Sequence, residues 1–401
     1  MRIAICGGGT VGGGVVEMLT RFSSSISIAY IVVREIGRKR DFEIPPGTIV
    51  TDRLADVLED ESVDTVVELM GGVDNAWELV RHCLRKGVNV VTANKALISK
   101  HLVEIQELLN SHTWPPAVLY EAAVCGGAPI VNAFLRGLRG DEISSVFGVM
   151  NGSTNWMLDK MDKEKVSYEV LFEEAKSLGY LEADPSADIM GWDARSKLCI
   201  LARLAFGSVL NEEKVVSRGI HTVGQPDIAY ANSIGKKIKL LARAWKEGNT
   251  VHAFVVPTLV DDTSAVGNLP GATNCVAFQA KYSGEHCMIG SGAGRYPTAN
   301  SVVADILEIE KSAKMKCHGW FDHFGIVESA CVFEPDFSAK FFLRANTHDS
   351  TLEIAARLEK VGIATELMLE FPALTTVECV SHSRLEKALD GSAVVSVLVV
   401  F

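Results

Sequence analysis

The sequence predicts an α/β protein with an N-terminal parallel sheet flanked by helices, an α+β middle domain and a small C-terminal βαββαβ domain. Three observations carry this prediction. An apolar segment at the N-terminus runs into a glycine-rich turn, strand-like and helical segments then alternate, and residues 341–400 have the order strand, helix, strand, strand, helix, strand. A chain of 401 residues is long enough for two or three domains. We expect the first domain over 1–135, completed by about 290–312, the second over 136–290 and the third over 313–401.

The N-terminal residues combine a strand, a glycine turn, a helix and a second strand. Arg2–Cys6 is the first strand and Ile26–Val33 the second, and the turn between them fits G-x-G-x-x-G through Gly7, Gly9 and Gly12. These glycines would allow a tight turn, the approach of a pyrophosphate and close packing of helix on strand. A glycine motif alone is a weak signal, and adjacent glycines allow more than one register. Its place directly after an N-terminal strand predicts a Rossmann-type dinucleotide site.

The residues after the second strand bear on the choice between NAD and NADP. An NAD site prefers an acidic residue here, because a carboxylate holds the ribose 2′-hydroxyl. Arg34 instead offers a guanidinium that could grip a 2′-phosphate through two hydrogen bonds, and basic residues follow at 38–40. A solvated loop of charges is the alternative reading, and Glu35 keeps NAD open. We predict NADP, with NAD as the alternative.

Two later strands end in loops that face the same edge of the predicted sheet. Residues 88–92 run into Lys95, and residues 118–122 precede a glycine-rich loop at 124–129. Ligands of open α/β sheets bind beyond the carboxyl ends of the strands, so Lys95 is placed to reach a pocket. A lone lysine after a strand is more often simply exposed.

The segment 180–206 contains the most informative charged residues. A helix is predicted to begin near Trp192, and Asp193 and Lys197 are four residues apart on it, so they share one face. The apolar residues at 200, 201 and 204 fall on that face too, so the pair lies in the stripe that an amphipathic helix buries. Burying both charges costs several kcal/mol unless they are paired or bind a charged ligand.

An exposed ion pair worth roughly 0.3–0.5 kcal/mol is the simpler reading of Asp193 and Lys197. The carboxylates upstream, at 182, 184 and 188, and the apolar remainder of the helix favour a polar pocket instead. A desolvated lysine suits proton transfer near neutral pH.

Composition excludes several classes of protein. A net charge of −11 argues against a nucleic-acid surface, and no apolar run reaches the ~18 residues of a membrane span. The N-terminus has no secretory signal pattern. The nine cysteines are scattered singly without a CxxC pair, which is typical of reduced thiols. We therefore expect a cytoplasmic protein without nucleic-acid or membrane partners.

Taken together, these segments resemble homoserine dehydrogenases. They occur in the family's order over residues 1–310, and the TANKA and GY-x-EADP elements are specific to it. The matching segments are ICGGGTVGGGVV, VVELMGG, VVTANKAL, YEAAVCGGAPI, NGSTNWML, LGYLEADPSADIMGWDARSKLCILA and GSGAGRYPTA.

The resemblance implies the NAD(P)-dependent interconversion of L-homoserine and L-aspartate 4-semialdehyde, a step in threonine, methionine and isoleucine biosynthesis. By motif, Lys197 would be the general acid/base, Asp193 a catalytic and substrate-binding partner, and Lys95 would lie where nicotinamide and substrate meet. The remaining implied contacts are Glu182 with the substrate amino group, Asp188 and Tyr180 in the same pocket, and Thr10, Val11, Thr92 and Gly294 at the cofactor.

The resemblance also implies a monovalent cation, Na⁺ or K⁺, held largely by main-chain carbonyls. These map to Glu121, Val124, Gly126 and Ala128. The departures from the family pattern are mild and remove no group that the reaction needs: Ser153 and Trp156 replace Thr and Tyr, and Cys125 and Ala128 occupy the cation loop.

The C-terminal residues resemble the regulatory ACT domain of many family members. This match is weaker, because the usual small-residue turn after the first strand is here Asn346–Asp349. An ACT domain would bind an amino-acid effector such as threonine and lower the activity. The resemblance further implies a homodimer formed through the middle, substrate-binding domain.

Two rival functions remain at this point. One is another NADP-dependent reductase, acting on a different amino-acid-derived aldehyde. The other is a catalytically silent sensor, in which the nucleotide domain and the C-terminal domain bind metabolites and regulate a partner. The presence of Lys95, Glu182, Asp193 and Lys197 together speaks against the sensor.

Overall fold

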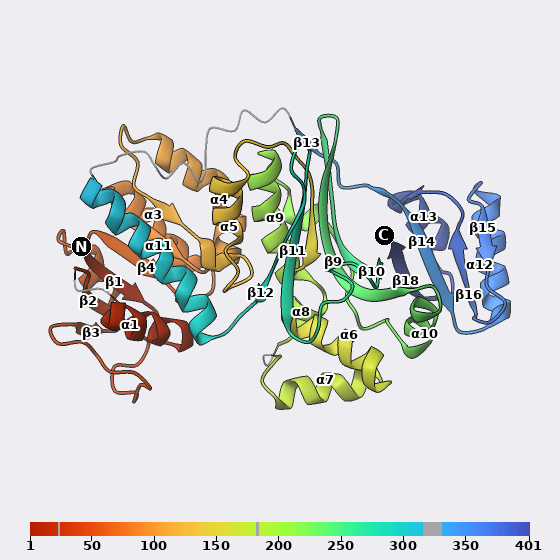
Figure 1. The fold of residues 1–401 in the computed structure, drawn as a ribbon, viewed down its shortest axis with the longest axis horizontal. Helices are drawn as coiled ribbons and strands as arrows, with labels where there is room; N and C mark the ends of the chain where they lie inside the picture. Colours follow the sequence, from red (N-terminus) through yellow and green to blue (C-terminus); the bar gives the residue numbers. More distant parts are fainter. Residues whose placement is uncertain (23–24, 182–183, 316–330) are drawn as a thin grey trace. The chain divides into compact units, whose positions relative to one another are not determined.

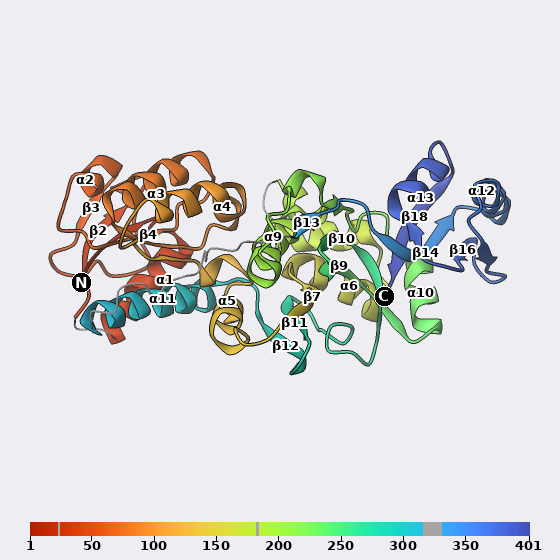
Figure 2. The same ribbon diagram turned by 90° about the horizontal axis from the view of Figure 1, so that it is seen from above.

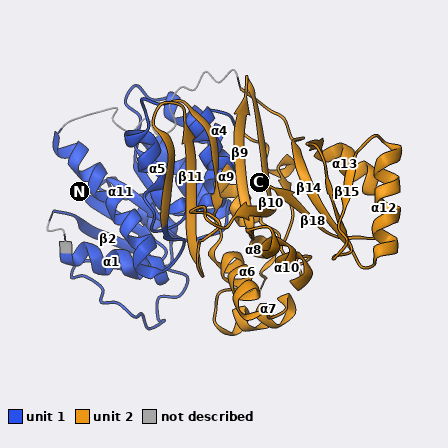
Figure 3. Ribbon diagram, turned by 45° about the vertical axis from the view of Figure 1, so that its right-hand side comes forward, with its two compact units in different colours: residues 1–141, 199–209, 290–329 blue, residues 142–198, 210–289, 330–401 orange. Residues whose placement is uncertain are grey.

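The chain forms two compact units, which Figure 3 shows in blue and orange. The computed structural model describes residues 1–22, 25–181, 184–315 and 331–401. Unit 1 contains residues 1–141, 199–209 and 290–329, and unit 2 contains 142–198, 210–289 and 330–401. Unit 2 thus holds both the middle and the C-terminal residues, and the boundary expected near residue 313 stays a prediction.

Unit 1 is built on a parallel sheet in the order β3-β2-β1-β4-β5-β6, the order of a Rossmann fold. Figure 2 shows α2, α3 and α4 over one face of this sheet and α1 and α11 over the other. The strands are β1 (Arg2–Cys6), β2 (Ser27–Val32), β3 (Ile49–Thr51), β4 (Thr65–Glu68), β5 (Asn89–Thr92) and β6 (Val118–Leu119). The helices are α1 (Thr10–Phe22), α2 (Leu54–Leu58), α3 (Asp74–Lys86), α4 (Lys95–Asn110), η1 (Glu121–Ala123), α5 (Ile130–Asn132), η2 (Ala133–Gly137) and α11 (Arg295–Met315).

Helix α11 returns from far along the chain to complete unit 1. Its apolar residues at 299, 302, 303, 306 and 309 are buried in one core with residues of α1, β1 and β2. Val15 and Leu19 of α1 belong to the same core, so the two helices share the burial of one face of the sheet. Helix α11 lies within the segment 290–312 that was expected to complete the first domain, and the exact domain bounds stay a prediction.

Unit 2 contains a long mixed sheet, in the order β12-β11-β7-β9-β10-β18-β14-β16-β15. The strands of its first part are β7 (Ile143–Val149), β8 (Val216–Ser217), β9 (Lys236–Glu247), β10 (Thr250–Asp261), β11 (Thr273–Ala280), β12 (Gly284–Ser291) and β13 (Val332–Phe333). Its helices are α6 (Gly152–Glu164), α7 (Tyr168–Ser177), α8 (Ser186–Ile189), η3 (Glu212–Lys214) and α10 (Gln225–Ser233). Helix α9 (Trp192–Phe206) begins in unit 2 and ends in unit 1.

The C-terminal residues form a module with the expected order strand, helix, strand, strand, helix, strand, and with an additional two-residue strand, β17, before the second helix (blue in Figure 1). It comprises β14 (Ser338–Ala345), α12 (His348–Lys360), β15 (Thr365–Leu367), β16 (Ala373–Thr376), β17 (Val380–Ser381), α13 (His382–Leu389) and β18 (Val394–Val400). The sheet order β18-β14-β16-β15 is the order of a ferredoxin-like fold. Strand β18 also pairs with β10 through Thr258 and Leu259, so the module extends the sheet of the middle residues.

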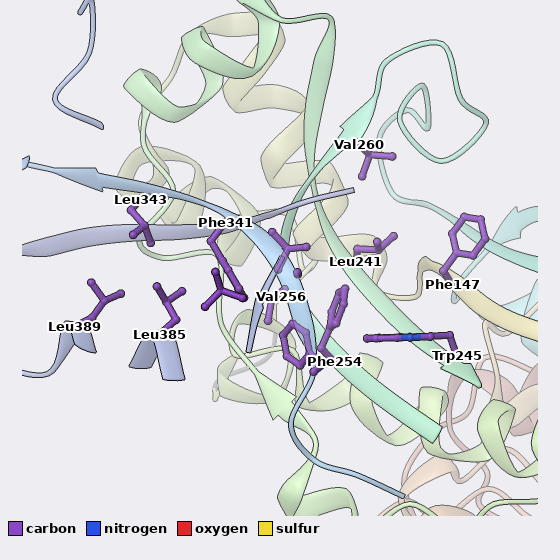
Figure 4. Close-up of a cluster of buried hydrophobic side chains, with 14 of the residues drawn as sticks. Phe147, Leu241, Trp245, Phe254, Val256, Val260, Phe341, Leu343, Leu385 and Leu389 are labelled. Atoms are coloured by element: carbon purple, nitrogen blue, oxygen red, sulfur yellow. The ribbon is translucent and has the colours of Figure 1, made fainter. Parts of the chain in front are cut away.

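One apolar cluster spans the middle residues and the module within unit 2 (Figure 4). Trp245 and Phe254, on β9 and β10, pack edge to face with ring centroids 5.8 Å apart. Phe337 and Phe341 lie beside them, and Leu385 of α13 reaches the same cluster. Burying several large side chains at about 1.5–3 kcal/mol each holds the module against the rest of unit 2.

Some predicted elements differ from the structure. The strand expected over 118–122 ends at Leu119, because Glu121–Ala123 turn into the single helical turn η1. Helix α6 begins directly after Asn151, whose side chain accepts a hydrogen bond from the Thr154 amide and caps the helix. Within the described residues, every helix is too short or too polar to cross a lipid bilayer.

A buried ion pair joins the module to the middle residues. Arg344 of β14 donates from Nε to Asp227 Oδ1 at 2.7 Å and from Nη2 to Oδ2 at 3.0 Å. Asp227, on α10, is fully buried, and Arg344 also donates to the Thr222 carbonyl. A buried pair of this kind is costly to break, because the surviving charge stays desolvated.

We predict that Arg344→Met lowers the free energy of unfolding by about 3–5 kcal/mol, because Asp227 is left buried without its partner. The matched control is Lys281→Met, which breaks an exposed pair with Glu142 and should cost less than about 1 kcal/mol. Urea denaturation of both variants measures the difference. Equal losses would contradict the structural role of the buried pair.

Candidate active site

The side chains of Asp193 and Lys197 are paired and buried at the start of α9. Lys197 Nζ donates to Asp193 Oδ2 at 2.7 Å and to the Met150 carbonyl at 2.6 Å. Each side chain is 9% exposed. The prediction that both residues share the buried face of one helix is confirmed. The backbone acceptor at Met150, just past the end of β7, was not predicted.

Asn151 joins this pair to a third acidic residue. Its Nδ2 donates to Asp193 Oδ2 at 2.9 Å and to Asp188 Oδ1 at 2.6 Å. Its Oδ1 accepts from the amide of Thr154, which fixes the direction of the side-chain amide. Two carboxylates and one ammonium are therefore held together by one neutral residue, and the arrangement can serve both proton transfer and recognition of a cationic group.

The other predicted substrate residues lie near the start of α6 or outside the described residues. The Tyr180 ring stacks on Trp156 with centroids 5.0 Å apart, and its carbonyl accepts from Ser153 Oγ at 2.7 Å. The two substituted positions of the family pattern, Ser153 and Trp156, thus support Tyr180. Glu182 lies outside the described residues.

The glycine turn between β1 and α1 has the shape of a dinucleotide cradle. Gly7 has φ +127°, which side chains rarely adopt. A Cβ at Gly12 would lie 1.9 Å from the Gly7 carbonyl oxygen, whereas a Cβ at Gly9 would meet nothing within 4 Å. Helix α1 begins at Thr10, with Val11 next, so its first amides face the open space above Gly9. The turn fits a pyrophosphate.

A buried carboxyl group organises the carboxyl edge of the sheet in unit 1. Thr92 Oγ1, at the end of β5, donates to Glu68 Oε2 of β4 at 2.6 Å. Burial raises the pKa of Glu68, although the hydrogen bond from Thr92 opposes this rise. Asn94 Oδ1 accepts from the amide of Leu97 and caps α4, and Lys95 is the first residue of that helix. Lys95 is therefore half-buried just past the carboxyl end of β5, and its contact with a ligand stays a prediction.

The basic loop after β2 is held by Arg40 rather than by Arg34. The Arg40 guanidinium donates to the carbonyls of Glu35, Ile36 and Arg38, and its Nε lies 3.6 Å from where a Gly8 Cβ would be. Arg40 thus shapes the loop over the glycine turn. Arg34 is exposed on that loop.

The predicted cation loop is tightly turned, and its acidic side chain is used internally. The Glu121 carboxylate accepts from the amides of Val131 and Asn132 at 2.9 and 2.8 Å, at the start of α5. Burial raises the pKa of Glu121, although these two hydrogen bonds oppose the rise. Cys125 and Gly126 both have positive φ, +54° and +50°, and a turned backbone of this kind redirects successive carbonyls.

Helix α11 fastens the same loop. Ser301 Oγ donates to the Gly126 carbonyl at 2.7 Å, and Asp305 Oδ2 accepts from the Glu121 amide at 3.0 Å. Burial, with the charge of Glu121 next, raises the pKa of Asp305. The turn that ends at Gly294 (φ +126°) begins α11 and lies against Gly126. Among the described residues, no cluster of three His, Cys, Asp or Glu side chains could hold a metal ion, so a cation here would depend on carbonyls, and that of Ala128 already accepts from the Ile130 amide.

Sequence reasoning missed several residues that organise the candidate functional residues within each unit. Asn151 and Glu68 stand within the motifs NGSTNWML and VVELMGG, yet nothing in their spacing shows that one bridges two carboxylates and the other holds Thr92. Asp305 lies in an ordinary helical segment, more than 180 residues from its partner Glu121. Only a structure brings such residues together.

Two family models match most of the chain between them. Residues 129–307 match the model described as homoserine dehydrogenase, and residues 7–114 match the model described as homoserine dehydrogenase, NAD binding domain. The chain is 33% identical over 383 residues to the homoserine dehydrogenase of Bacillus subtilis (strain 168), covering 93% of this chain and 88% of that relative.

Solved structures of homoserine dehydrogenases are similar to all or most of this chain. The crystal structure of a homoserine dehydrogenase from Thiobacillus denitrificans aligns with a TM-score of 0.85 and 29% identity, covering 100% of this chain and 98% of that one. A hyperthermophilic archaeal homoserine dehydrogenase in complex with NADPH aligns with a TM-score of 0.66 and 27% identity, covering 79% of this chain and 98% of the other.

Proposed function

Because this chain belongs to the homoserine dehydrogenase family, we propose that it interconverts L-homoserine and L-aspartate 4-semialdehyde with Lys197 as the proton donor and acceptor. It is an NAD(P)-dependent oxidoreductase acting on a CH–OH group. The observation that carries the role of Lys197 is its burial between Asp193 and the Met150 carbonyl, which holds one amine in a fixed place. The reaction belongs to the biosynthesis of threonine, methionine and isoleucine.

The reaction needs a hydride and a proton to move at one carbon–oxygen bond. The nicotinamide, when bound, supplies or accepts the hydride. In the reducing direction, charge develops on the substrate oxygen, and the Lys197 ammonium stabilises that charge and donates a proton. In the oxidising direction, the neutral amine takes the hydroxyl proton. Whenever the Lys197 amine is protonated, the Asp193 carboxylate balances its positive charge, so the buried ammonium always has a counter-ion.

The acidic residues around Lys197 suit a substrate that carries an ammonium group. Asp188 and Asp193 are held by Asn151, so their positions do not depend on substrate. We assign them to the substrate amino group together with Glu182, whose role rests on the family resemblance. Tyr180 closes the same region from its place on Trp156, and Lys95 acts where nicotinamide and substrate meet.

We predict that Lys197→Ala lowers kcat by about 100-fold or more, as expected when a positioned acid/base is lost. The measurement is homoserine oxidation followed at 340 nm. Lys214→Ala removes an exposed lysine of the same unit and should leave the rate unchanged. Near-normal turnover in a folded Lys197→Ala protein that still binds NADPH would refute the assignment.

For the cofactor, we propose NADP in preference to NAD. The shape of the glycine turn supports a bound pyrophosphate, and Thr10, Val11, Thr92 and Gly294 would supply further contacts to the cofactor. Arg34 supplies the guanidinium for the 2′-phosphate, and Arg40 supports it by ordering the loop through three backbone carbonyls. Glu35, beside Arg34, is the residue that an NAD-binding variant would use.

We expect Arg34→Ala to lower kcat/KM for NADP by about 10- to 100-fold, the loss of charged hydrogen bonds worth about 1.5–3 kcal/mol. The value for NAD should change less than threefold. Arg38→Ala, an exposed arginine of the same loop, is the control and should alter neither cofactor. If Arg34→Ala weakened both cofactors equally, Arg34 would not read the 2′-phosphate.

We further propose that the loop 121–128 holds a monovalent cation, Na⁺ or K⁺, through the carbonyls of Glu121, Val124, Gly126 and Ala128. The consecutive left-handed residues Cys125 and Gly126 support this, because they turn carbonyls toward one side of the loop. The buried carboxyl groups of Glu121 and Asp305 hold the backbone of this loop in place through the amides of Val131, Asn132 and Glu121. For assembly, we propose a homodimer formed through the middle residues of unit 2, on the family resemblance.

For regulation, we propose that the C-terminal module acts as an ACT-like domain and binds an amino-acid effector. A cavity of about 350 Å³ lies between the module and the segment 217–222. Arg218 and Glu386 form an ion pair at this cavity, and Val394, Val395 and Leu389 line its apolar wall. A zwitterion with an aliphatic side chain matches such a lining, because its carboxylate can pair with Arg218 and its ammonium with Glu386.

Hydrogen bonds connect this cavity to the catalytic residues. Ser217 Oγ donates to the Met190 carbonyl at 2.6 Å, and the Ile220 amide donates to the Ile189 carbonyl at 3.2 Å. Both carbonyls belong to the end of α8, the short helix that carries Asp188. An effector that moved Arg218 would therefore act on a segment joined to Asp193 and Lys197 through Asn151.

We predict that millimolar threonine lowers the rate of homoserine oxidation and that Glu386→Gln raises the half-inhibitory threonine concentration at least tenfold, about the loss of one charged contact. Lys387→Gln, on the exposed side of α13, is the matched control. The rate without threonine is the internal reference for each variant. A threonine-insensitive wild type, or unchanged inhibition of Glu386→Gln, would contradict this site.

A further inference from the structure

Two cysteines of unit 2 that are 12 residues apart in the sequence have their side chains in contact. Cys275 on β11 and Cys287 on β12 have their Sγ atoms 3.0 Å apart. The strands are joined by residues 281–283 and are neighbours in the sheet, so they run antiparallel. Cα atoms opposite one another on such strands are about 4.5–5.5 Å apart, within the range that a disulfide spans.

The two thiols differ in their access to solvent. Cys287 is exposed, and Cys275 is fully buried beneath it. An exposed cysteine that can meet a small reagent, with a buried cysteine in contact to displace that reagent, is the arrangement of a reactive and a resolving thiol. Cys379 is also exposed, on the C-terminal module.

Each cysteine is next to a segment that the proposed reaction uses. Cys275 pairs with Val149 of β7, and the following residue, Met150, offers its carbonyl to Lys197. Cys287 lies three residues before Gly290, where the chain enters the turn that leads to α11. In unit 1, the next residue of that turn, Ser291, accepts from the Gly127 amide in the proposed cation loop.

We propose that Cys275 and Cys287 are a thiol–disulfide modification site, oxidised by a low-molecular-weight disulfide, and that oxidation lowers the dehydrogenase activity. The expected loss of dehydrogenase activity rests on the proposed function. The Cys287 thiolate attacks one sulfur of the small disulfide, forms a mixed disulfide and releases one small thiolate. The Cys275 thiolate then attacks the Cys287 sulfur, forms the Cys275–Cys287 bond and releases the second small thiolate.

The exchange balances without any other oxidant. Two protein thiols lose their protons and two small thiolates take them up, so two protein thiols and one small disulfide become one protein disulfide and two small thiols. Reversible disulfides of reduced compartments are mostly catalytic or redox-sensing, which fits a pair on a hairpin between functional segments. The new bond cross-links β11 to β12 and restrains the strand that sits beside β7.

The test incubates the full-length enzyme with oxidised glutathione and follows two independent readouts. Peptide mapping by mass spectrometry should find a Cys275–Cys287 disulfide within single chains, and homoserine oxidation at 340 nm should fall at least threefold. Dithiothreitol should restore the rate. Cys287→Ser, at an exposed position, should abolish both the disulfide and the loss of activity, and Cys379→Ser should abolish neither.

Several outcomes would overturn the proposal. These are two thiols that both stay alkylatable after incubation, a disulfide that joins two chains, and a disulfide that forms with no change in rate. Cys275→Ala provides a second test, because it should stop at the glutathione adduct on Cys287. The disulfide readout requires no activity, so a protein without dehydrogenase activity would refute the proposed function while leaving the modification site testable on its own.

Discussion

The contact on which the catalytic region depends is the buried ion pair of Lys197 and Asp193. Taking both charges out of water costs several kcal/mol, and the cost is offset only where every polar atom finds a partner. The end of β7 supplies the Met150 carbonyl to the ammonium, and Asn151, the next residue, supplies its amide to both Asp193 and Asp188. The cap of α6, the start of α9 and the short helix α8 are thereby fixed around one amine.

Unit 1 has a different structural requirement, because it must leave space for a ligand. The glycine turn leaves room above Gly9 for an anion, and the loop at 121–128 adopts a strained backbone that ordinary packing would avoid. Helix α11 makes this loop stable by returning to the sheet and holding it through Ser301 and Asp305. The same helix begins at the Gly294 turn, so one late segment of the chain supports both the cofactor cradle and the proposed cation loop.

Local patterns predicted the parts of the fold that local chemistry controls. The glycine turn, the end of β5, the face shared by Asp193 and Lys197 and the order of the C-terminal elements follow from short-range spacing. Contacts between residues that are far apart in the sequence leave no such pattern in it. The β18–β10 contact that merges two sheets, the Arg344–Asp227 pair and the Cys275–Cys287 contact each depend on where distant segments meet. The place of Arg34 directly after β2 predicts its contact with the cofactor, whereas the hydrogen bonds by which Arg40 holds that loop leave no signal in the sequence.

The most direct measurement of the central claim is a crystal structure of the enzyme with NADP and a non-reacting analogue of homoserine. The account predicts Lys197 Nζ within hydrogen-bond distance, about 2.6–3.2 Å, of the oxygen that gains or loses the proton, with Asp193 still paired to it. A substrate oxygen beyond reach of that nitrogen, directly or through one water, and instead hydrogen-bonded to another acid or base, would contradict it.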